Sequence, residues 1–458
     1  MVLGISYLSR FLQTVIAYKA KLLCSGIFVS DRTQHSLRKE DLSVGILVLL
    51  RLLRSTVDYE QTTVTVSLLG RFTRTALYRP GLGSTLVIGT TVEELRSQAK
   101  AYRHNNRHNN RQSKHYQVLT SKALPKRINK AALSQAIDTA FIENNPRRLK
   151  RTRAVLILHR GDIVSERYAP GFSAKMPLLG WSMAKSVVNA LIGILVQQGK
   201  LSLDSKDLLP EWRNSNDPRR EITVDHLLRM SSGLKFSENY ASPLSDITTL
   251  LFQVRDSAHF TARLPLQTTP GNKFSYSGGS TILLCRIIQE VLSNSLSDYF
   301  AFPKQALFGR IGMTSAILEP DTAGTFIGSS FMYATARDWA KLGLLYLQDG
   351  CWKAENQWER ILPEGWVQYS TTPSKTADFY GAHFWRGVPN AFTTSKRDDT
   401  HWPKSAFLAA GFQGQFITIL PKHDLVVVRL GLSHSKHSWN QTQFISQIAA
   451  CFEHRLSN

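Results

Sequence analysis

Two strand–turn–strand patterns, far apart in the chain, place the strongest constraint on the fold. The first runs from Ala154 to His159, turns at Gly161, and returns from Ile163 to Tyr168. The second pairs Phe416 to Leu420 with Leu425 to Leu430, and a mostly helical pattern lies between the two hairpins. Strands at both ends of one domain predict an antiparallel sheet assembled from distant segments. We therefore expect an α+β domain with flanking helices and a mostly helical insert.

Composition divides the chain of 458 residues into three predicted parts. Residues 1–98 contain short helical and β-branched runs and form an N-terminal segment that docks on a membrane or on another domain. Residues 99–130 form a basic linker, because the stretch from Arg103 to Lys130 is polar and contains no acidic residue. Residues 131–458 form the α+β domain, beginning with a helix from Ala131 to Ile142.

The net charge of +22 is concentrated at the N-terminal end. This basic region predicts contact with an anionic surface, such as lipid or a cell-wall polymer. The basic stretch reads as a disordered linker or, alternatively, as a phosphate-binding arm. Since no aromatic or groove-reading motif accompanies it, we expect no specific nucleic-acid binding.

The apolar runs near the N-terminus are too short to predict a bilayer-spanning helix. The run from Phe11 to Tyr18 is followed closely by Lys19, and the run from Val44 to Leu53 contains Arg51. A span needs about 18 apolar residues. We expect the second run to be a buried or docking amphipathic helix rather than a membrane contact, and the N-terminus is a poor secretion signal.

No metal or cofactor is expected. The four cysteines are far apart, with no C-x-x-C pair, and no His-Glu-x-x-His pattern occurs. The same spacing shows no disulfide framework.

A possible nucleophile lies in Ser182-Met183-Ala184-Lys185, directly before the apolar run from Val187 to Val196. On a helix, a lysine three residues after a serine lies on the same face, within reach of the hydroxyl. Burial disfavours the charged form of an amine, so a partly buried lysine can supply a general base near pH 7. The spacing alone also fits an N-capped helix with a surface lysine.

Three further segments occur with this motif, each in a fixed order along the chain. They are the helix and loop Glu221 to Leu234, the Phe274-Ser275-Tyr276-Ser277-Gly278-Gly279 segment, and the Ala409-Ala410-Gly411-Phe412-Gln413-Gly414-Gln415 turn. Together with S-x-x-K, they resemble the serine β-lactamase-like superfamily over residues 132–456. The W-S-M-A-K-S core is most similar to the branch of 6-aminohexanoate-dimer hydrolase-like serine hydrolases. The resemblance implies a β-lactamase/transpeptidase-like fold and an acyl-enzyme mechanism.

The resemblance also implies roles for individual residues. Ser182 would be the nucleophile, Lys185 its general base, and Tyr276 a proton relay to the leaving group. The N–H of Ser182 lies at a helix N-terminus, which suits a developing oxyanion. The second oxyanion donor is expected at Gln413, with Gly414 beside it. Tyr240 would contact the substrate amide, as a loop tyrosine does in the aminohexanoate-hydrolase branch; a packing role is the alternative.

Two departures from the family pattern narrow the expected substrate. Gly278 stands where the Tyr-x-Asn motif has its asparagine, so Ser277 or another group must replace that amide. No Lys-Thr-Gly or His-x-Gly precedes Gly411, where the sequence reads Ser405 to Ala410. In the family such a cationic residue helps to bind a substrate carboxylate. We therefore expect a small-molecule neutral ester or amide rather than a β-lactam or peptidoglycan peptide.

Two other functions stay open at this point. One is a β-lactamase or D-alanyl-D-alanine carboxypeptidase, and the other is a non-catalytic binding protein that interacts through its basic N-terminal region. The compartment is not fixed by the sequence. Relatives of this fold are often exported, which favours a bacterial cell envelope location over a cytoplasmic one.

Overall fold

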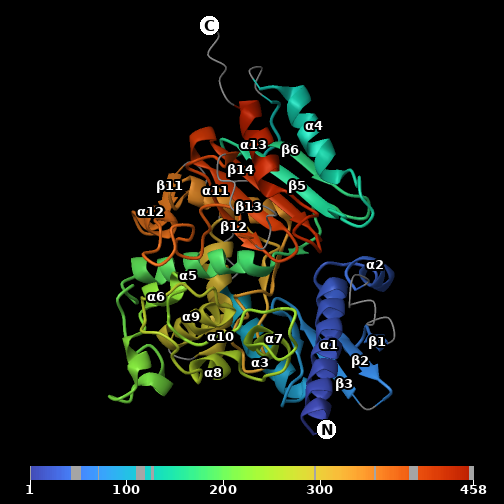
Figure 1. Ribbon diagram of the computed structural model, residues 1–458, viewed down its shortest axis with the longest axis vertical. Coiled ribbons are helices and arrows are strands. Elements are labelled where there is room, and N and C mark those ends of the chain that lie inside the picture. Colours follow the sequence, from blue (N-terminus) through green and yellow to red (C-terminus); the bar gives the residue numbers. More distant parts are fainter. Residues whose placement is uncertain are drawn as a thin grey trace. The chain divides into compact units, whose positions relative to one another are not determined.

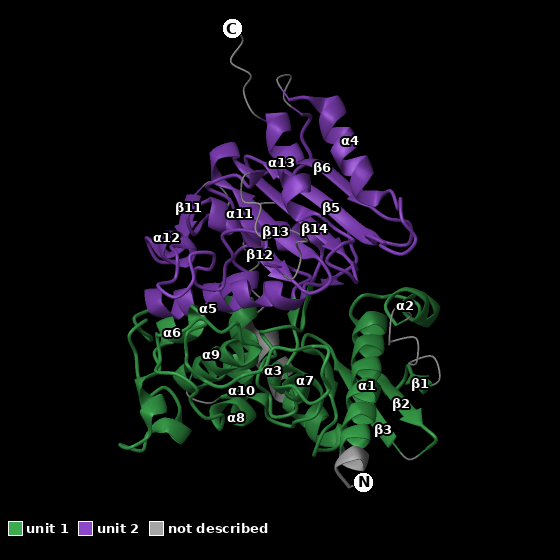
Figure 2. Ribbon diagram, in the orientation of Figure 1, with its two compact units in different colours: residues 1–113, 198–305, 317–333 green, residues 114–197, 306–316, 334–458 purple. Residues whose placement is uncertain are grey.

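The computed structural model describes residues 2–42, 53–70, 72–109, 119–124, 128–292, 295–354, 357–390 and 401–452 (Figure 1). The chain divides into two compact units (Figure 2), and both are discontinuous in sequence. Unit 1 comprises residues 1–113, 198–305 and 317–333, and unit 2 comprises residues 114–197, 306–316 and 334–458.

Unit 2 contains the predicted antiparallel sheet. Its five strands follow the order β12-β13-β14-β5-β6. They are β5 (Thr152–His159), β6 (Asp162–Tyr168), β12 (Phe407–Gly411), β13 (Gln415–Leu420) and β14 (Leu425–Gly431). Strand β14 pairs with β5 from Leu425 opposite His159 to Gly431 opposite Thr152, which joins the two predicted hairpins into one sheet. The expected assembly of the sheet from both ends of the domain is confirmed.

Helices cover both faces of this sheet. Helices α4 (Lys130–Phe141) and α13 (Gln441–Phe452) pack together, and their buried residues Ile137 and Ile445 share a core with Ile157 of β5. Helix α11 (Ala336–Leu347) packs against β5, β13 and β14. The other elements of unit 2 are β7 (Leu178–Leu179), η2 (Trp181–Met183), α5 (Ala184–Gln197), β10 (Cys351–Ala354), β11 (Gln357–Arg360), α12 (Trp366–Thr371) and η8 (Pro421–His423).

Unit 1 joins the N-terminal segment to the helical insert. The N-terminal elements are α1 (Val2–Phe28), α2 (Gln34–Glu40), a four-stranded antiparallel sheet of β1 (Arg54–Asp58), β2 (Thr63–Leu68), β3 (Phe72–Arg79) and β4 (Gly83–Leu86), and α3 (Val92–Asn109). The insert contributes η3 (Pro210–Trp212), η4 (Pro218–Glu221), α6 (Val224–Leu228), α7 (Asp246–Phe252), α8 (Ser257–Ala262), α9 (Gly278–Val291), α10 (Leu296–Phe302) and β8 (Ile317–Leu318). The π-helical turn η5 (Pro303–Phe308) and strand β9 (Met332–Ala334) each cross a unit boundary in sequence.

A buried ion pair ties helix α1 to the insert. The Lys21 Nζ lies 2.5 Å from the Glu319 carboxylate, and both side chains are almost fully buried. The same carboxylate accepts hydrogen bonds from the Ser25 hydroxyl (2.8 Å) and from the Ser84 N–H (2.7 Å). Helix α1, strand β4 and the residue after β8 therefore meet at one carboxylate. Because an unpaired buried charge is costly, these three segments stabilise one another.

The N-terminal segment differs from expectation in two respects. The predicted boundaries at residues 98 and 130 do not coincide with the compact units, since residues 1–113 pack with the insert. The predicted linker begins inside helix α3, which continues to Asn109; residues 110–118 and 125–127 lie outside the described part of the chain. The predicted helix from Val44 also lies outside it, up to residue 52.

The expectation that no N-terminal apolar run is long enough to span a bilayer is wrong. The segment Tyr7–Phe28 within α1 is long and apolar enough by length and composition. Lys19 interrupts the apolar run in the sequence, but its ammonium group is buried and donates to the Leu53 carbonyl at 2.6 Å. Such a helix is compatible with an envelope location, but 67% of its apolar window is buried within the protein.

Candidate active site

Ser182 and Lys185 face each other at the start of helix α5. Ser182 lies in the 3-10 turn η2, and α5 begins two residues later. The Lys185 Nζ lies 3.1 Å from the Ser182 Oγ. The lysine is 1% exposed, whereas the serine is only half-buried. A buried amine therefore contacts a hydroxyl that solvent can reach, which excludes the alternative of a surface lysine.

Helix α5 is held in place by a satisfied polar network around Asn189. The Asn189 side-chain N–H groups donate to the Ser370 Oγ (3.1 Å) and the Ala382 carbonyl (2.9 Å). Its Oδ1 accepts hydrogen bonds from the Tyr346 hydroxyl and from the Trp366 Nε1. A buried amide with every partner in place gives a helix one defined position. The network therefore fixes the helix that carries Lys185.

A second contact fixes the backbone of Lys185 itself. The buried His383 Nδ1 lies 2.9 Å from the Lys185 carbonyl, and the Ser186 hydroxyl donates to the His383 carbonyl at 2.7 Å. Since a carbonyl only accepts, the Nδ1 atom carries the proton. Burial and the Lys185 charge lower the pKa of His383 to about 3. The imidazole is therefore neutral near pH 7 and acts as a fixed donor.

The turn between β12 and β13 approaches the segment just before Ser182. A Cβ built on Gly411, the last residue of β12, would lie 2.1 Å from the Gly180 carbonyl oxygen, so only glycine fits there. The Trp181 Nε1 donates to the Gln413 Oε1 at 3.2 Å, and the Trp181 ring packs edge-on against Phe412. The end of strand β12 and the turn that carries Ser182 are thus in direct contact within unit 2.

Two backbone donors near this contact are free. Within the described part of the chain, neither the Ser182 N–H nor the Gln413 N–H donates a hydrogen bond. Buried or half-buried amides are normally paired, so two free donors on touching segments are typical of an anion-binding position.

Buried Arg429 supports the same turn through its guanidinium group. Its guanidinium donates to the Gly414 carbonyl (2.6 Å), the Lys150 carbonyl (2.7 Å) and the Ser433 Oγ (2.9 Å). The Ser433 N–H in turn donates to the Gln413 carbonyl at 2.9 Å. Gln413 and Gly414 both have positive φ, at 63° and 82°. These contacts hold a strained turn in one conformation, as a preorganised site requires.

Unit 1 carries the remaining predicted residues. Tyr276 is half-buried and precedes Ser277, the N-cap of helix α9. The Ser277 Oγ accepts a hydrogen bond from the Ser280 N–H at 3.2 Å, so its hydroxyl caps the helix. Tyr240 is half-buried, and its hydroxyl donates to the Glu238 carboxylate at 3.1 Å. Burial, followed by the Glu238 charge, raises the pKa of Tyr240 well above its ordinary value, so it is a neutral phenol.

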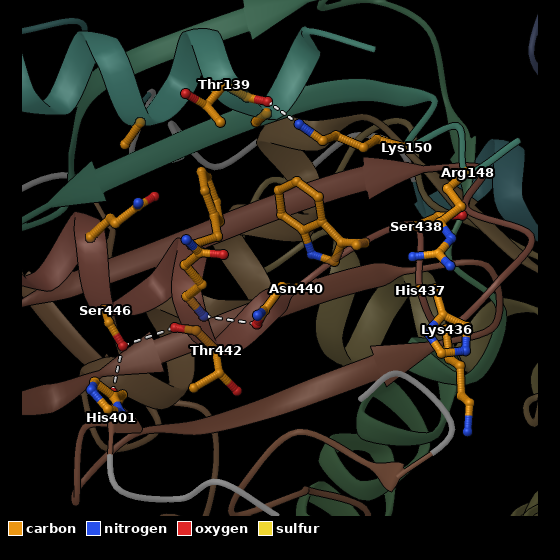
Figure 3. A pocket seen from close by; sticks show the side chains of 16 residues that line it. Thr139, Arg148, Lys150, His401, Lys436, His437, Ser438, Asn440, Thr442 and Ser446 are labelled. Atoms are coloured by element: carbon orange, nitrogen blue, oxygen red, sulfur yellow. Dashed lines mark hydrogen bonds between the residues drawn. The ribbon is translucent and has the colours of Figure 1, made fainter. Parts of the chain in front are cut away.

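Unit 2 contains a cavity of about 800 Å³ (Figure 3). It is lined by residues of α4 and α13 and includes Arg148, Lys150 and Lys436 but neither Ser182 nor Lys185. Among the residues that the structure describes, no group of three or more His, Cys, Asp or Glu side chains could hold a metal ion. The four cysteines are free.

The family comparison assigns the chain to a class of proteins. The chain matches the Beta-lactamase family over residues 147–438 and belongs to that family. It therefore has the fold of serine hydrolases of the β-lactamase type.

Individual relatives agree with this assignment. The chain is 23% identical over 298 residues to 6-aminohexanoate-dimer hydrolase of Paenarthrobacter ureafaciens, covering 61% of this chain and 72% of that protein. Among solved structures it resembles a family VIII carboxylesterase (TM-score 0.53, 13% identity, 73% and 99% coverage of the two chains). It also resembles a penicillin-binding protein homologue from Caulobacter crescentus (TM-score 0.52, 15% identity, 72% and 99% coverage). The predicted α+β, β-lactamase/transpeptidase-like fold is confirmed.

The sequence analysis did not identify two supporting residues, His383 and Arg429. Each bonds to a backbone atom of a segment that is remote in the sequence, so local residue spacing cannot predict its role. The sequence contains a weak indication of the role of Arg429. An arginine within an apolar strand such as β14 is buried and must therefore have hydrogen-bond partners.

Proposed function

We propose that this protein hydrolyses a neutral amide or ester through an acyl-enzyme on Ser182. The observation that carries the proposal is the 3.1 Å contact between the buried Lys185 Nζ and the Ser182 Oγ. A serine hydroxyl is a weak nucleophile unless a base removes its proton, and this amine is the base within hydrogen-bond reach.

The proposed reaction has two steps, acylation of Ser182 and hydrolysis of the acyl-enzyme. The Ser182 Oγ attacks the substrate carbonyl carbon while its proton passes to the Lys185 amine. The bond from that carbon to the leaving nitrogen or oxygen then breaks, and the leaving group receives the proton that Lys185 accepted, through Tyr276, the relay that the family resemblance assigns. Water next attacks the acyl-enzyme, the carboxylic acid leaves, and Ser182 regains its proton.

The two free backbone donors would stabilise the oxyanion of each tetrahedral intermediate. We assign this role to the N–H groups of Ser182 and Gln413, with Gly414 shaping the turn. The support is the close packing of Gly411 on Gly180 and the rigid hold of Arg429 on the turn. Removing a single oxyanion donor typically costs about 10²–10³-fold in kcat.

The substrate class follows from what strand β12 lacks. Its residues, Phe407 to Gly411, include no lysine, arginine or histidine that could bind a substrate carboxylate. We therefore favour a neutral ester or amide over a β-lactam, and Tyr240 is assigned to contact the substrate amide.

The basic N-terminal region stays a proposed contact for an anionic surface. Binding to anionic vesicles that weakens as the salt concentration rises would support this proposal.

Steady-state kinetics of a matched lysine pair test the general base. Lys185→Met should lower kcat/KM for a p-nitrophenyl ester by about 10²–10⁴-fold, the usual contribution of a general base. Lys175→Met, which alters an exposed lysine of the same unit, should leave it unchanged. Equal activity of the two variants would remove Lys185 from the mechanism.

Parallel assays of the wild-type protein test the substrate class. A short linear amide should be turned over, whereas a chromogenic cephalosporin should be turned over little or not at all.

A further inference from the structure

The cavity that helices α4 and α13 line in unit 2 is basic (Figure 3). The side chains on its wall that can carry a positive charge are those of Arg148, Lys150, His401, Lys436 and His437. None of the described lining residues is Asp or Glu. A cleft lined by one sign of charge raises the local concentration of ions of the opposite sign. The cavity therefore attracts anions.

Two of these cations are not neutralised by a carboxylate. Within the described part of the chain, neither Arg148 nor Lys436 forms a salt bridge. The Lys150 Nζ donates to the Thr139 carbonyl at 2.5 Å. The carboxylate of Glu143, which is not part of the lining, accepts hydrogen bonds from the backbone N–H groups of Lys150 (2.7 Å) and Arg151 (2.6 Å). One carboxylate thus offsets only part of the positive charge.

A buried guanidinium adds positive charge beside the cavity wall. The Arg429 Cζ lies 4.3 Å from the ring centroid of Trp439, and Trp439 lines the cavity. Among the described residues, Arg429 donates only to carbonyl and hydroxyl oxygens. Burial is the main effect that lowers the pKa of Arg429 to about 9, so the group stays charged near pH 7. Because water and salt screen a buried charge poorly, this one contributes to the potential in the cavity.

The cavity also has an apolar part. Its buried apolar lining consists of Ala136 and Ala140 of α4, Trp439, and Phe444 of α13. The volume of about 800 Å³ lies within the range of small-molecule sites, about 300–1,000 Å³. A single inorganic ion would fill only a small part of it. The lining therefore suits an organic anion better than a free ion.

We propose that this cavity binds a small organic anion, whose phosphate or carboxylate group contacts Arg148 and Lys436 and whose apolar part lies against the apolar lining. Both head groups present anionic oxygens that accept hydrogen bonds from arginine and lysine. The proposal is independent of acyl transfer, since neither Ser182 nor Lys185 lines the cavity.

Isothermal titration calorimetry of the full chain with phenyl phosphate and with benzoate tests the site. Each probe carries one anionic group and one apolar ring. We expect saturable binding of at least one probe, at one site per chain and with a Kd below about 1 mM. The probe that binds more tightly identifies the head group. Absence of saturable binding for both probes would overturn the proposal.

Two adjacent arginines provide a matched control. Arg148 lines the cavity, whereas Arg147 does not, and both are exposed. Their hydrogen bonds to Asn145 use backbone N–H groups, so alanine at either position should leave the fold intact. Arg148→Ala should weaken binding about 10-fold, the usual loss for a hydrogen bond to a charged group. Arg147→Ala should bind like wild type; equal weakening in the two variants would indicate unspecific attraction and contradict the site.

Two further comparisons test the apolar part. Phenyl phosphate and benzoate should bind more tightly than inorganic phosphate and acetate, respectively, and equal affinities would contradict an organic ligand. Thr139→Trp places a large side chain on the cavity wall from an exposed position of α4, so it should block binding. Ser134→Trp, at an exposed position of the same helix outside the lining, should not. Unchanged binding in Thr139→Trp would place the ligand elsewhere and overturn the proposal.

Discussion

At the scale of single residues, the candidate site depends on neutral donors held in fixed places. His383 is the clearest case, because its Nδ1–H is bonded to the Lys185 carbonyl and its backbone to Ser186. The residue has a φ of 57°, a conformation that Asn tolerates better than most side chains. Asparagine also keeps an N–H donor near the position of Nδ1, so His383→Asn is a conservative test.

His383 should make the folded protein sensitive to acid. Its pKa is lowered from 6.5 to about 3 on folding, so its contribution to stability is complete above pH 6.5 and is lost as the pH falls towards 3. Between pH 6 and 4, wild type should lose about 1.4 kcal/mol of unfolding free energy per pH unit more than His383→Asn. Urea titrations at several pH values measure this difference, and parallel pH profiles for the two proteins would contradict it.

Gly414, in the turn between β12 and β13, can be compared with Gly171 in a matched pair of alanine substitutions. An alanine Cβ at Gly414 would lie 2.4 Å from the Arg429 Nη1, whereas at Gly171, with nearly the same φ, nothing lies within 4 Å. Each alanine should cost about 1–2 kcal/mol of backbone strain. Gly414→Ala should cost more in thermal unfolding and should also lower kcat; equal stability losses with equal activity would argue against a structural role for this contact.

At the scale of secondary structure, helix α1 is a core element of unit 1. Lys21 donates both to the Ser84 carbonyl and to the Glu319 carboxylate, and burial is the largest effect, lowering the pKa of Lys21. Lys21→Met would leave Glu319 buried without its cation. We expect a loss of about 3–5 kcal/mol in urea unfolding.

The matched control for this ion pair removes both charges. Lys21→Met combined with Glu319→Leu should be less destabilised than Lys21→Met alone, because no charge is left unpaired. If the single variant were as stable as wild type, α1 would not be anchored through this pair.

The elements themselves could largely be predicted from the sequence. The local sequence pattern was enough to predict these elements. Continuous apolar runs form strands β5, β13 and β14, and an apolar run after a capping serine forms helix α9. Helix α1 could not be predicted at full length, because lysines that pair internally look like surface lysines in a sequence. The Ser182–Lys185 contact follows from helix spacing, whereas the support from His383 and Arg429 depends on the tertiary fold.

At the scale of the whole chain, the N-terminal region is part of a compact unit rather than an appendage. Aromatic contacts join it to the insert, with Tyr18 against Phe252 and Tyr102 against Phe300. A chain beginning at residue 128 would expose these apolar surfaces and leave Glu319 without Lys21 and Ser25.

We expect this truncated chain to aggregate or to bind a hydrophobic dye, while the full chain stays folded. Size-exclusion chromatography and circular dichroism measure the outcome. A monomeric truncated protein with an unchanged melting temperature would show that residues 1–127 do not support the fold.

Covalent labelling is the sharpest test of whether Ser182 forms the proposed acyl-enzyme. The full chain is treated with a fluorophosphonate probe, and the adduct is located by intact mass and peptide mapping. We expect one adduct per chain on Ser182, none in Ser182→Ala, and full labelling in Ser173→Ala, which alters an exposed serine of the same unit. Stoichiometric labelling of Ser182→Ala at another serine would contradict it.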